Sequence, residues 1–244
     1  MRWFIDLSYN GGAYHGWQVQ PGVVTVQSVI EDALQRLVGA PMPIVGAGRT
    51  DAGVNARQMI AHVDLPDDFD PLRPEFLRSL NALCGRDIAI HSFTQVAADA
   101  HARFDATERT YRYMAHTAKD PFAGKLSWQA PPNLDFDAMN RAAVAILGRR
   151  DFTSFSKLHT DVKTNICDLR AAAWHRIDDC HWYFEITADR FLRNMVRAVV
   201  GTLVDVGRHK VGEDHLQAVV EARDRCAAGT SMPPEPLFLW SIKY

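Results

Sequence analysis

The order in which strand-like and helix-like segments follow one another restricts the fold of this 244-residue chain more than any other feature. Residues 3–9 are aromatic and β-branched, as in a strand, and Asn10-Gly11-Gly12 favours a turn. Apolar residues between 26 and 37 then recur with the spacing of an amphipathic helix, with Thr25 as N-cap and Gly39 as stop. The chain therefore opens with a predicted strand, turn and helix.

The rest of the first half completes a unit of six elements. Residues 41–45 and 58–65 are strand-like, and a glycine-bearing segment separates them. A helix is predicted at 71–84, opened by two prolines, and a strand at 88–93. The order β-α-β-β-α-β is that of the ferredoxin-like unit.

The second half offers a similar order with longer insertions. Strands are predicted at 110–115, 168–176, 181–188 and 237–242, and helices at 136–147, 191–206 and 213–223. The sequence thus predicts an α+β chain of two ferredoxin-like halves, residues 1–103 and residues 104–244, with antiparallel sheets.

The charge balance excludes one class of nucleic-acid binder. The chain has 27 Lys and Arg against 29 Asp and Glu, a formal net charge of -2, so it cannot bind a polyanion through a diffuse basic tail. Arginines nevertheless gather along 103–112 and 190–210, and acids along 64–70 and 213–224. If 191–206 is helical, Arg190, Arg193 and Arg197 line one face, either as a binding surface or as an ordinary solvated face.

Cysteine spacing and hydropathy exclude further classes. The four cysteines lie far apart with no C-x-x-C pair, which favours neither a zinc site nor a redox dithiol. No apolar run approaches the ~20 residues that span a bilayer, and Asp6 interrupts any signal-peptide core. We expect a cytoplasmic protein that uses no metal.

The segment Gly46-Ala47-Gly48-Arg49-Thr50-Asp51-Ala52-Gly53-Val54 is the most unusual in the chain. It lacks the lysine of a nucleotide-binding loop. In an extended segment Arg49 and Asp51 project to the same side, and a guanidinium beside a carboxylate favours its ionised form. Asp51 could then serve as a nucleophile or base, or the pair could be a salt bridge that only stabilises the loop.

The same segment resembles the signature of the bacterial tRNA pseudouridine synthase A family. Five further segments resemble that family's motifs in the same order: Tyr9 to Gln20, Thr25 to Leu34, His101 to Tyr113, Asp151 to Phe155 and Phe191 to Gly201. The resemblance runs nearly end to end.

The resemblance implies a role for individual residues. Asp51 takes the place of the family's catalytic aspartate, and Tyr111 that of the tyrosine that meets the target base. Arg49 and Arg197 match basic residues that flank or pair with the aspartate. The remaining candidates are expected to hold phosphates without reading sequence: Arg103, Arg190 and Arg193.

The resemblance also implies a fold, a substrate and an assembly. The family has two ferredoxin-like halves whose sheets join across a central basic cleft, the pseudouridine synthase fold, and acts as a homodimer. Its substrate is tRNA, at uridines 38, 39 and 40 of the anticodon arm. Because the reaction is an isomerisation that adds no group, we expect no metal, nucleotide or redox cofactor. Three alternatives remain: an RNA-binding protein of this fold without the chemistry, a synthase acting on another RNA, and a small-molecule enzyme such as a sugar isomerase.

The sequence departs from the family pattern at three places. Asn55 stands where His is common, which favours a positioning role because Asn cannot shuttle protons at neutral pH. Pro236 stands where Gly is usual, so a stiffer loop is expected there. The segment from His159 to Asp168 matches only loosely, and no functional residue is assigned in it.

Overall fold

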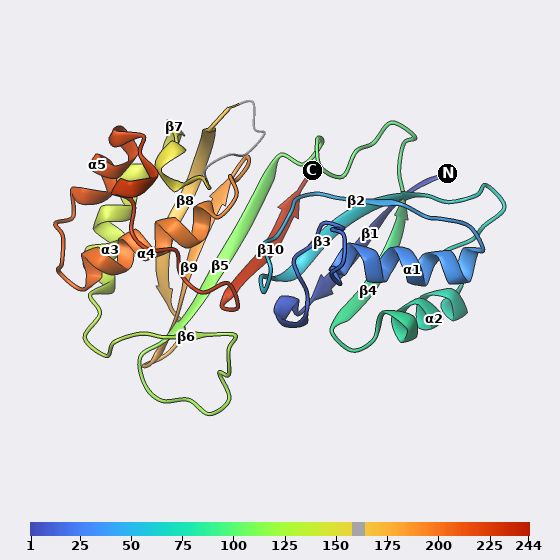
Figure 1. Cartoon of the computed structure of the whole chain (residues 1–244), viewed down its shortest axis with the longest axis horizontal. Helices are drawn as coiled ribbons and strands as arrows, with labels where there is room; N and C mark the ends of the chain where they lie inside the picture. Colours follow the sequence, from blue (N-terminus) through green and yellow to red (C-terminus); the bar gives the residue numbers. More distant parts are fainter. Residues whose placement is uncertain (158–163) are drawn as a thin grey trace. The chain divides into compact units, whose positions relative to one another are not determined.

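The computed structural model of the chain describes residues 1–157 and 164–244 (Figure 1). Residues 158–163, which fall in the loosely matching segment, lie outside the described residues. The chain divides into two compact units, one of Met1–Thr107 with Leu239–Tyr244 and the other of Glu108–Phe238. The division of the chain into domains 1–103 and 104–244, predicted from the sequence, stays a prediction.

The first unit contains the six predicted elements in the predicted order. They are β1 (Arg2–Tyr9), α1 (Val26–Val38), β2 (Ile44–Gly46), β3 (Asn55–Asp64), α2 (Pro74–Cys84) and β4 (Ile88–Gln95). β1 pairs antiparallel with both β3 and β4, and β2 pairs antiparallel with Ala61–Val63 of β3. The last strand, β10 (Leu237–Lys243), is also a neighbour of β3. This arrangement confirms the ferredoxin-like prediction for the first half.

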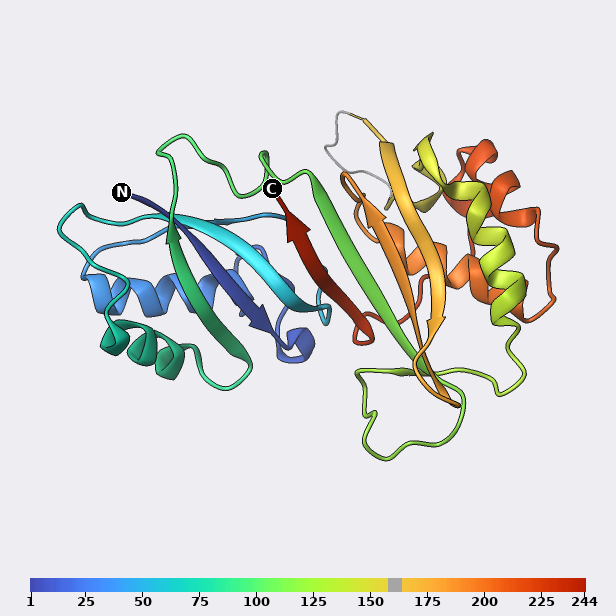
Figure 2. The same cartoon turned by 180° about the vertical axis from the view of Figure 1, so that it is seen from behind.

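Helices α1 and α2 lie on the same face of this sheet, in front of it in Figure 1 and behind it in Figure 2. The buried face of β1 presents Trp3, Ile5 and Leu7, which alternate with more exposed residues as a half-buried strand requires. The buried positions of α1 include Ile30 and Leu34, one helical turn apart.

The limits of α1 follow from its sequence as predicted. The Thr25 hydroxyl accepts a hydrogen bond from Ser28 N at 3.2 Å, and the Ser28 hydroxyl accepts one from Thr25 N at 3.1 Å. This reciprocal capping box satisfies two backbone donors that the helix leaves unpaired. At the other end Gly39 has φ +85°, the left-handed conformation that ends a helix.

The second unit is built on a four-stranded antiparallel sheet in the order β5-β9-β8-β7. These four strands are β5 (Glu108–His116), β7 (Gly148–Asp151), β8 (Ile166–Arg176) and β9 (His181–Ala188). A further short strand, β6 (Trp128–Gln129), pairs parallel with β5. Its helices are α3 (Phe136–Ala143), α4 (Met195–Gly207) and α5 (His215–Ala222). α4 is buried along almost its whole length, so it forms the centre of this unit's core.

The start of α4 corrects one prediction. The helix begins at Met195 rather than near residue 191, because Asn194 adopts a left-handed conformation with φ +67° that cannot continue it. Leu192 is buried in the preceding loop, so the apolar pattern continues there without a helix. Arg190 and Arg193 therefore precede the helix, and the predicted helical face shared with Arg197 is wrong.

Smaller differences have local causes. β2 begins at Ile44, after Pro41 and Pro43, which lack the N–H that a strand ladder uses. The helix predicted at 136–147 ends at Ala143 and tightens into a 3₁₀ turn over Val144–Ile146. β6 and β7 are too short to be predicted from their sequence pattern. Within the described ranges, no helix is both long enough and apolar enough to cross a membrane.

Candidate active site

Asp51 lies in the connection between β2 and β3 of the first unit. Ala47 N donates to Ile60 O at 2.8 Å, which fixes the start of this connection against β3. Val54 N donates to Asp51 O at 3.1 Å and closes a turn just before β3 begins. The carboxylate, which is partly buried, is thus carried by a short loop fixed at both ends.

The segment from Tyr9 to Trp17 holds this loop on either side of Asp51. The Tyr9 hydroxyl is hydrogen-bonded to the Thr50 hydroxyl at 2.8 Å in a buried position. Trp17 N donates to Thr50 O at 3.2 Å, and Gly53 N donates to Tyr14 O at 3.4 Å. The segment from Tyr9 to Trp17, called the aromatic motif below, therefore positions the Asp51 loop.

Close backbone approach explains the glycines of both segments. Gly16 has φ +86°, and a Cβ there would lie 2.5 Å from Thr50 O. A Cβ on Gly46 would lie 2.6 Å from the buried Trp17 ring, and one on Gly11 would collide with Val54 O. Only glycine lets the two segments pack this closely.

Asn55 joins the same network from the first position of β3. Its side chain is 1% exposed, and its Oδ1 accepts a hydrogen bond from Gly11 N at 2.8 Å. The residue that departs from the family pattern thus holds backbone in place, which agrees with the positioning role expected of it.

Helix α1 ties the network to β2. Val26 N donates to Gly16 O and Gln27 N to Trp17 O, each at 3.1 Å. The Gln27 side chain donates to Ile44 O at 2.9 Å. The aromatic motif, the helix start and the Asp51 loop are consequently one hydrogen-bonded assembly.

Tyr111 lies on β5 of the second unit, opposite Ile186 of β9. Its ring meets Phe191 edge to face, with centroids 5.1 Å apart and planes at 85°. The loop that carries Phe191 is fixed just before it, because Arg190 N donates to the Asp189 carboxylate at 2.7 Å and Arg109 donates to Asp189 O at 2.8 Å. Tyr111 therefore has a defined ring orientation.

Tyr113, two residues along β5, is buried. Burial raises the pKa of its phenol, with the negative charge of Glu235 adding to the effect and Arg197 opposing it. Tyr113 stays neutral and belongs to the core.

Arg197 lies in the first turn of α4. Its Nε donates to Met232 O at 2.6 Å, while Met232 N donates to Arg197 O at 3.1 Å. The exposed Arg193 accepts a hydrogen bond at its carbonyl from Lys157 N at 3.1 Å. Two bonds thus hold Arg197 to the segment before β10.

The predicted site residues divide between the two units. Asp51, Arg49 and Arg103 belong to the first unit, and Tyr111, Arg190, Arg193 and Arg197 to the second. Arg49 is exposed two residues before Asp51, and Arg103 is exposed in a turn after β4. The roles assigned to these residues remain predictions.

Sequence reasoning assigned no role to Tyr9, Thr50, Gly16 or Trp17, the residues that brace the Asp51 loop. A signal for them was present. Glycines next to aromatic residues at 11–17, in a chain with a second glycine-rich segment at 46–53, are what two closely packed loops require.

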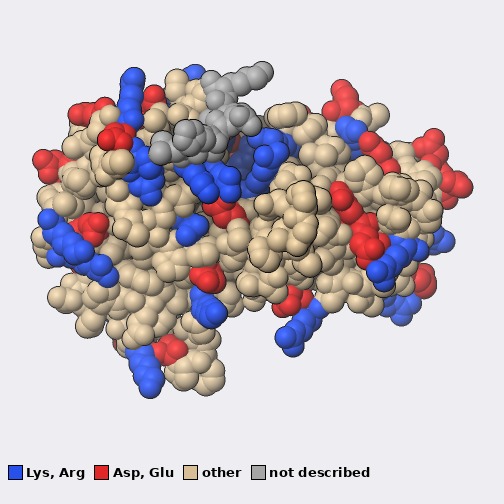
Figure 3. Space-filling model, viewed as in Figure 1, with Lys and Arg blue, Asp and Glu red and all other residues tan. Residues whose placement is uncertain are grey.

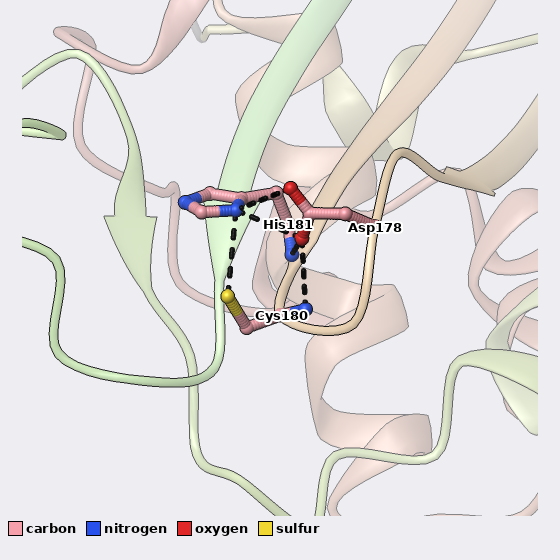
Figure 4. A group of neighbouring side chains, drawn as sticks. All are labelled: Asp178, Cys180 and His181. Carbon is pink, nitrogen blue, oxygen red and sulfur yellow. Dashed lines mark hydrogen bonds and ion pairs between the residues drawn. The ribbon is translucent and has the colours of Figure 1, made fainter.

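One group of side chains in the second unit has the residue types of a metal site: Asp178, Cys180 and His181 (Figure 4). Their ligand atoms lie within 4.8 Å of one another. Both Asp178 oxygens are 2.9 Å from His181 Nδ1, and Asp120 Oδ2 is 3.1 Å from His181 Nε2. Hydrogen bonds to Asp178 and Asp120 raise the pKa of His181, which favours the protonated ring over the neutral one that a metal needs. The group fits an ion-paired hairpin turn better than a metal centre.

A cavity of about 520 Å³ lies near this hairpin, lined by residues from 116–129 and 233–236. Its wall carries Lys119, Lys125 and Trp128 together with Asp120 and Glu235. These stretches are separate from those that carry the predicted site residues.

Both signs of charge occur on each unit in the face drawn in Figure 3. Several basic side chains are already paired with acids, for example Arg112 with Glu185 at 2.8 Å and Arg141 with Glu213 at 2.7 Å. On the face drawn there, a polyanion would therefore meet particular basic positions rather than a uniformly basic surface.

Comparison with known proteins places these observations in a family. A family model described as tRNA pseudouridine synthase matches residues 142–244. The chain is 54% identical over 244 residues to tRNA pseudouridine synthase A of Parabacteroides distasonis, covering 100% of this chain and 96% of that protein. It is 49% identical to the Bacteroides thetaiotaomicron protein of the same name, covering 100% of this chain and 90% of the relative.

More distant proteins also match over the full length. The Bacillus subtilis tRNA pseudouridine synthase A is 37% identical, covering 100% of this chain and 99% of that protein. At these identities and coverages, the similarity extends through both units and through every segment that carries a predicted site residue. The chain belongs to the tRNA pseudouridine synthase A family.

Proposed function

We propose that this protein isomerises uridines 38, 39 and 40 in the anticodon arm of tRNA to pseudouridine, with Asp51 as the essential carboxylate. The observation that carries the proposal is the Asp51 loop, in which buried and backbone hydrogen bonds from Tyr9, Tyr14 and Trp17 hold the residues on both sides of the carboxylate. A loop fixed in this way can present one carboxylate at a constant position, as catalysis requires.

The reaction needs one carboxylate and adds no group. The N1–C1′ bond of the uridine breaks, the uracil turns, and C5 bonds to C1′, after which the proton on C5 leaves and N1 is protonated. An ionised Asp51 would start the reaction either by attacking C1′ or by removing the proton on C2′. Both routes use the same residue.

Tyr111 is proposed to contact the target base. Taking a base out of its stack costs a few kcal/mol, and a base–aromatic contact returns ~1–3 kcal/mol. The edge-to-face contact with Phe191 supports this role because it fixes the orientation of the ring. From the family resemblance, Arg49 and Arg197 are proposed as basic residues that assist the carboxylate, and Arg103, Arg190 and Arg193 as phosphate contacts.

The family resemblance further leads us to propose a homodimer that works in the cytoplasm. Light scattering coupled to size-exclusion chromatography tests the assembly directly. A mass near the 27.4 kDa of one chain at micromolar concentration would reject the dimer.

The proposed activity is tested by mapping pseudouridine with a carbodiimide, because the product has the same mass as the substrate. Purified protein is incubated with a tRNA transcript carrying uridines at 38, 39 and 40, and with a matched transcript carrying cytidines there. The proposal expects adducts at these positions in the first transcript and none at them in the second. Binding without adducts would favour an RNA-binding protein without the chemistry, and adducts elsewhere would favour another target.

A further inference from the structure

A strongly exposed aromatic residue stands on the turn that follows β4. Phe104 is 74% exposed, although apolar rings are normally covered. A single exposed apolar side chain is common and proves nothing by itself. Phe104 differs from an ordinary exposed ring in the structure of the turn that carries it.

Hydrogen bonds fix this turn within the first unit. Asp105 N donates to His101 O at 3.0 Å, and His101 N donates to the Asp105 carboxylate at 2.7 Å. His101 Nδ1 accepts from both Arg103 N at 3.1 Å and Phe104 N at 3.2 Å. Ala102 N donates at 3.1 Å to Nδ1 of the buried His62 on β3. The turn is thus anchored to the sheet.

The side chains on this turn form a layered aromatic group. The Phe104 and His101 rings lie 4.1 Å apart with planes at 32°, and His101 meets His62 edge-on at 4.7 Å. The Arg103 guanidinium lies 5.8 Å from the centre of the Phe104 ring. The group has the composition of a stacking platform for nucleobases, an exposed aromatic ring packed against a second ring with a cation over it.

Phe122 in the second unit provides the contrast. It is even more exposed, at 94%, but its ring takes part in no aromatic contact found among the described residues. Exposure alone therefore does not distinguish Phe104. The rigid turn and the stacked rings do, because a preorganised ring loses little entropy on binding.

We propose that Phe104, supported by His101 and accompanied by the Arg103 guanidinium over its ring, stacks an unpaired base of the RNA substrate. The inference rests on the proposed function for the identity of the RNA. It assigns Phe104 to substrate binding at a position separate from the carboxylate chemistry of Asp51.

The test compares four variants in filter binding of one tRNA transcript at one salt concentration. Phe104→Ala and Phe104→Leu should weaken binding about 5- to 100-fold, because both lose a stacking contact of the usual strength. Phe104→Trp should bind within twofold of the wild type. The matched control Phe122→Ala should also stay within twofold.

The Leu variant separates stacking from simple apolar contact. If Phe104→Leu binds like the wild type, or if Phe122→Ala loses as much affinity as Phe104→Ala, the stacking assignment is overturned. A change of elution volume in Phe104→Ala would instead show a contact between protein chains and would equally overturn it.

Turnover measurements distinguish this inference from the proposed function. For Phe104→Ala, KM for tRNA should rise while kcat changes little, the signature of lost uniform binding. If wild-type protein forms no pseudouridine, the proposed function fails, and the binding series still tests stacking on RNA. If the wild type is active and Phe104→Ala has the wild-type KM, only the stacking inference fails.

Discussion

Single backbone positions decide whether the Asp51 loop can keep its place. Gly16 and Gly22 both have positive φ, +86° and +76°, but they differ in surroundings. A Cβ on Gly16 would lie 2.5 Å from Thr50 O, whereas one on Gly22 would meet nothing within 4 Å. Substitutions at these two positions therefore distinguish the free-energy cost of a left-handed backbone from the free-energy cost of a steric clash.

Gly16→Ala should be much more damaging than Gly22→Ala. Both variants carry the ~1–2 kcal/mol cost of an L-residue in a left-handed conformation. Gly16→Ala should lose about 1–3 kcal/mol more in the free energy of unfolding, because it also overpacks the site. Urea denaturation measures this difference, and turnover should fall at least about tenfold in Gly16→Ala alone. Equal losses in the two variants would show that the close approach is unimportant.

At the residue scale the sequence nominates candidate chemical groups but not the residues that hold them in place. Asp51 and Tyr111 could be nominated because they lie in motifs that resemble a family's. The bonds from Tyr9 to Thr50 and from Gly11 to Asn55 span about 40 residues of chain, and no local pattern shows which distant groups will meet.

At the scale of elements, segments with strong local signals could be predicted. α1 has both a capping box and a terminal glycine, and β9 was predicted with the bounds that the structure has. The start of α4 could not be predicted, because the loop before it buries Leu192 and so imitates the helical pattern. A buried residue in a loop and a buried residue on a helix are both apolar, so the sequence pattern does not distinguish them.

The hairpin between β8 and β9 should depend on pH through His181. Hydrogen bonds to Asp178 and Asp120 raise the pKa of His181, and backbone and His181 hydrogen bonds lower that of Asp178 to about 2. A raised histidine pKa gives stability that is complete below the unfolded value of about 6.5 and is lost as pH rises through the folded value. A lowered aspartate pKa gives stability above about 3.9 that is lost as pH falls.

His181→Gln should therefore cost most stability between about pH 4 and 6.5, where the ring is charged and both carboxylates are ionised. The nearby groups His116 and Cys180 remain in both proteins, but burial and the charge of His181 lower the pKa of His116, so the difference between wild type and variant includes the effect of His181 on His116. Unfolding free energies measured from pH 5 to 9 should converge towards the alkaline end. A difference that grows with pH would contradict the ion-paired arrangement.

At the scale of the whole molecule, the last strand shows what element order cannot reveal. Leu239–Tyr244 belong to the first unit although they end the chain, and Ile242 N donates to the Gln58 side chain of β3 at 3.1 Å. Local sequence patterns do not show which strands pair when they lie so far apart in the chain. A division of the chain by sequence order therefore groups this strand with the elements that precede it.

Because the whole molecule is nearly neutral, the proposed RNA binding has to depend on a few basic positions. With a formal charge of -2, phosphate contacts must be local, and each one releases counterions when it forms. Affinity for tRNA should fall steeply with salt, and Arg193→Ala should reduce the slope of log affinity against log salt by about one. The exposed Arg36, paired with Asp32, offers the control Arg36→Ala, which should leave the slope unchanged. An affinity indifferent to salt would exclude the phosphate contacts.

The carboxylate of Asp51 is proposed to carry out the isomerisation of uridine in tRNA. Asp51→Asn keeps the shape of the side chain and removes its charge, while Asp32→Asn makes the same change on the exposed face of α1 as a control. Pseudouridine formation at positions 38 to 40, mapped with a carbodiimide, should be abolished in Asp51→Asn and unchanged in Asp32→Asn. Affinity of Asp51→Asn for tRNA should stay within several-fold of the wild type. Normal pseudouridine formation by Asp51→Asn would show that the reaction does not need the Asp51 carboxylate.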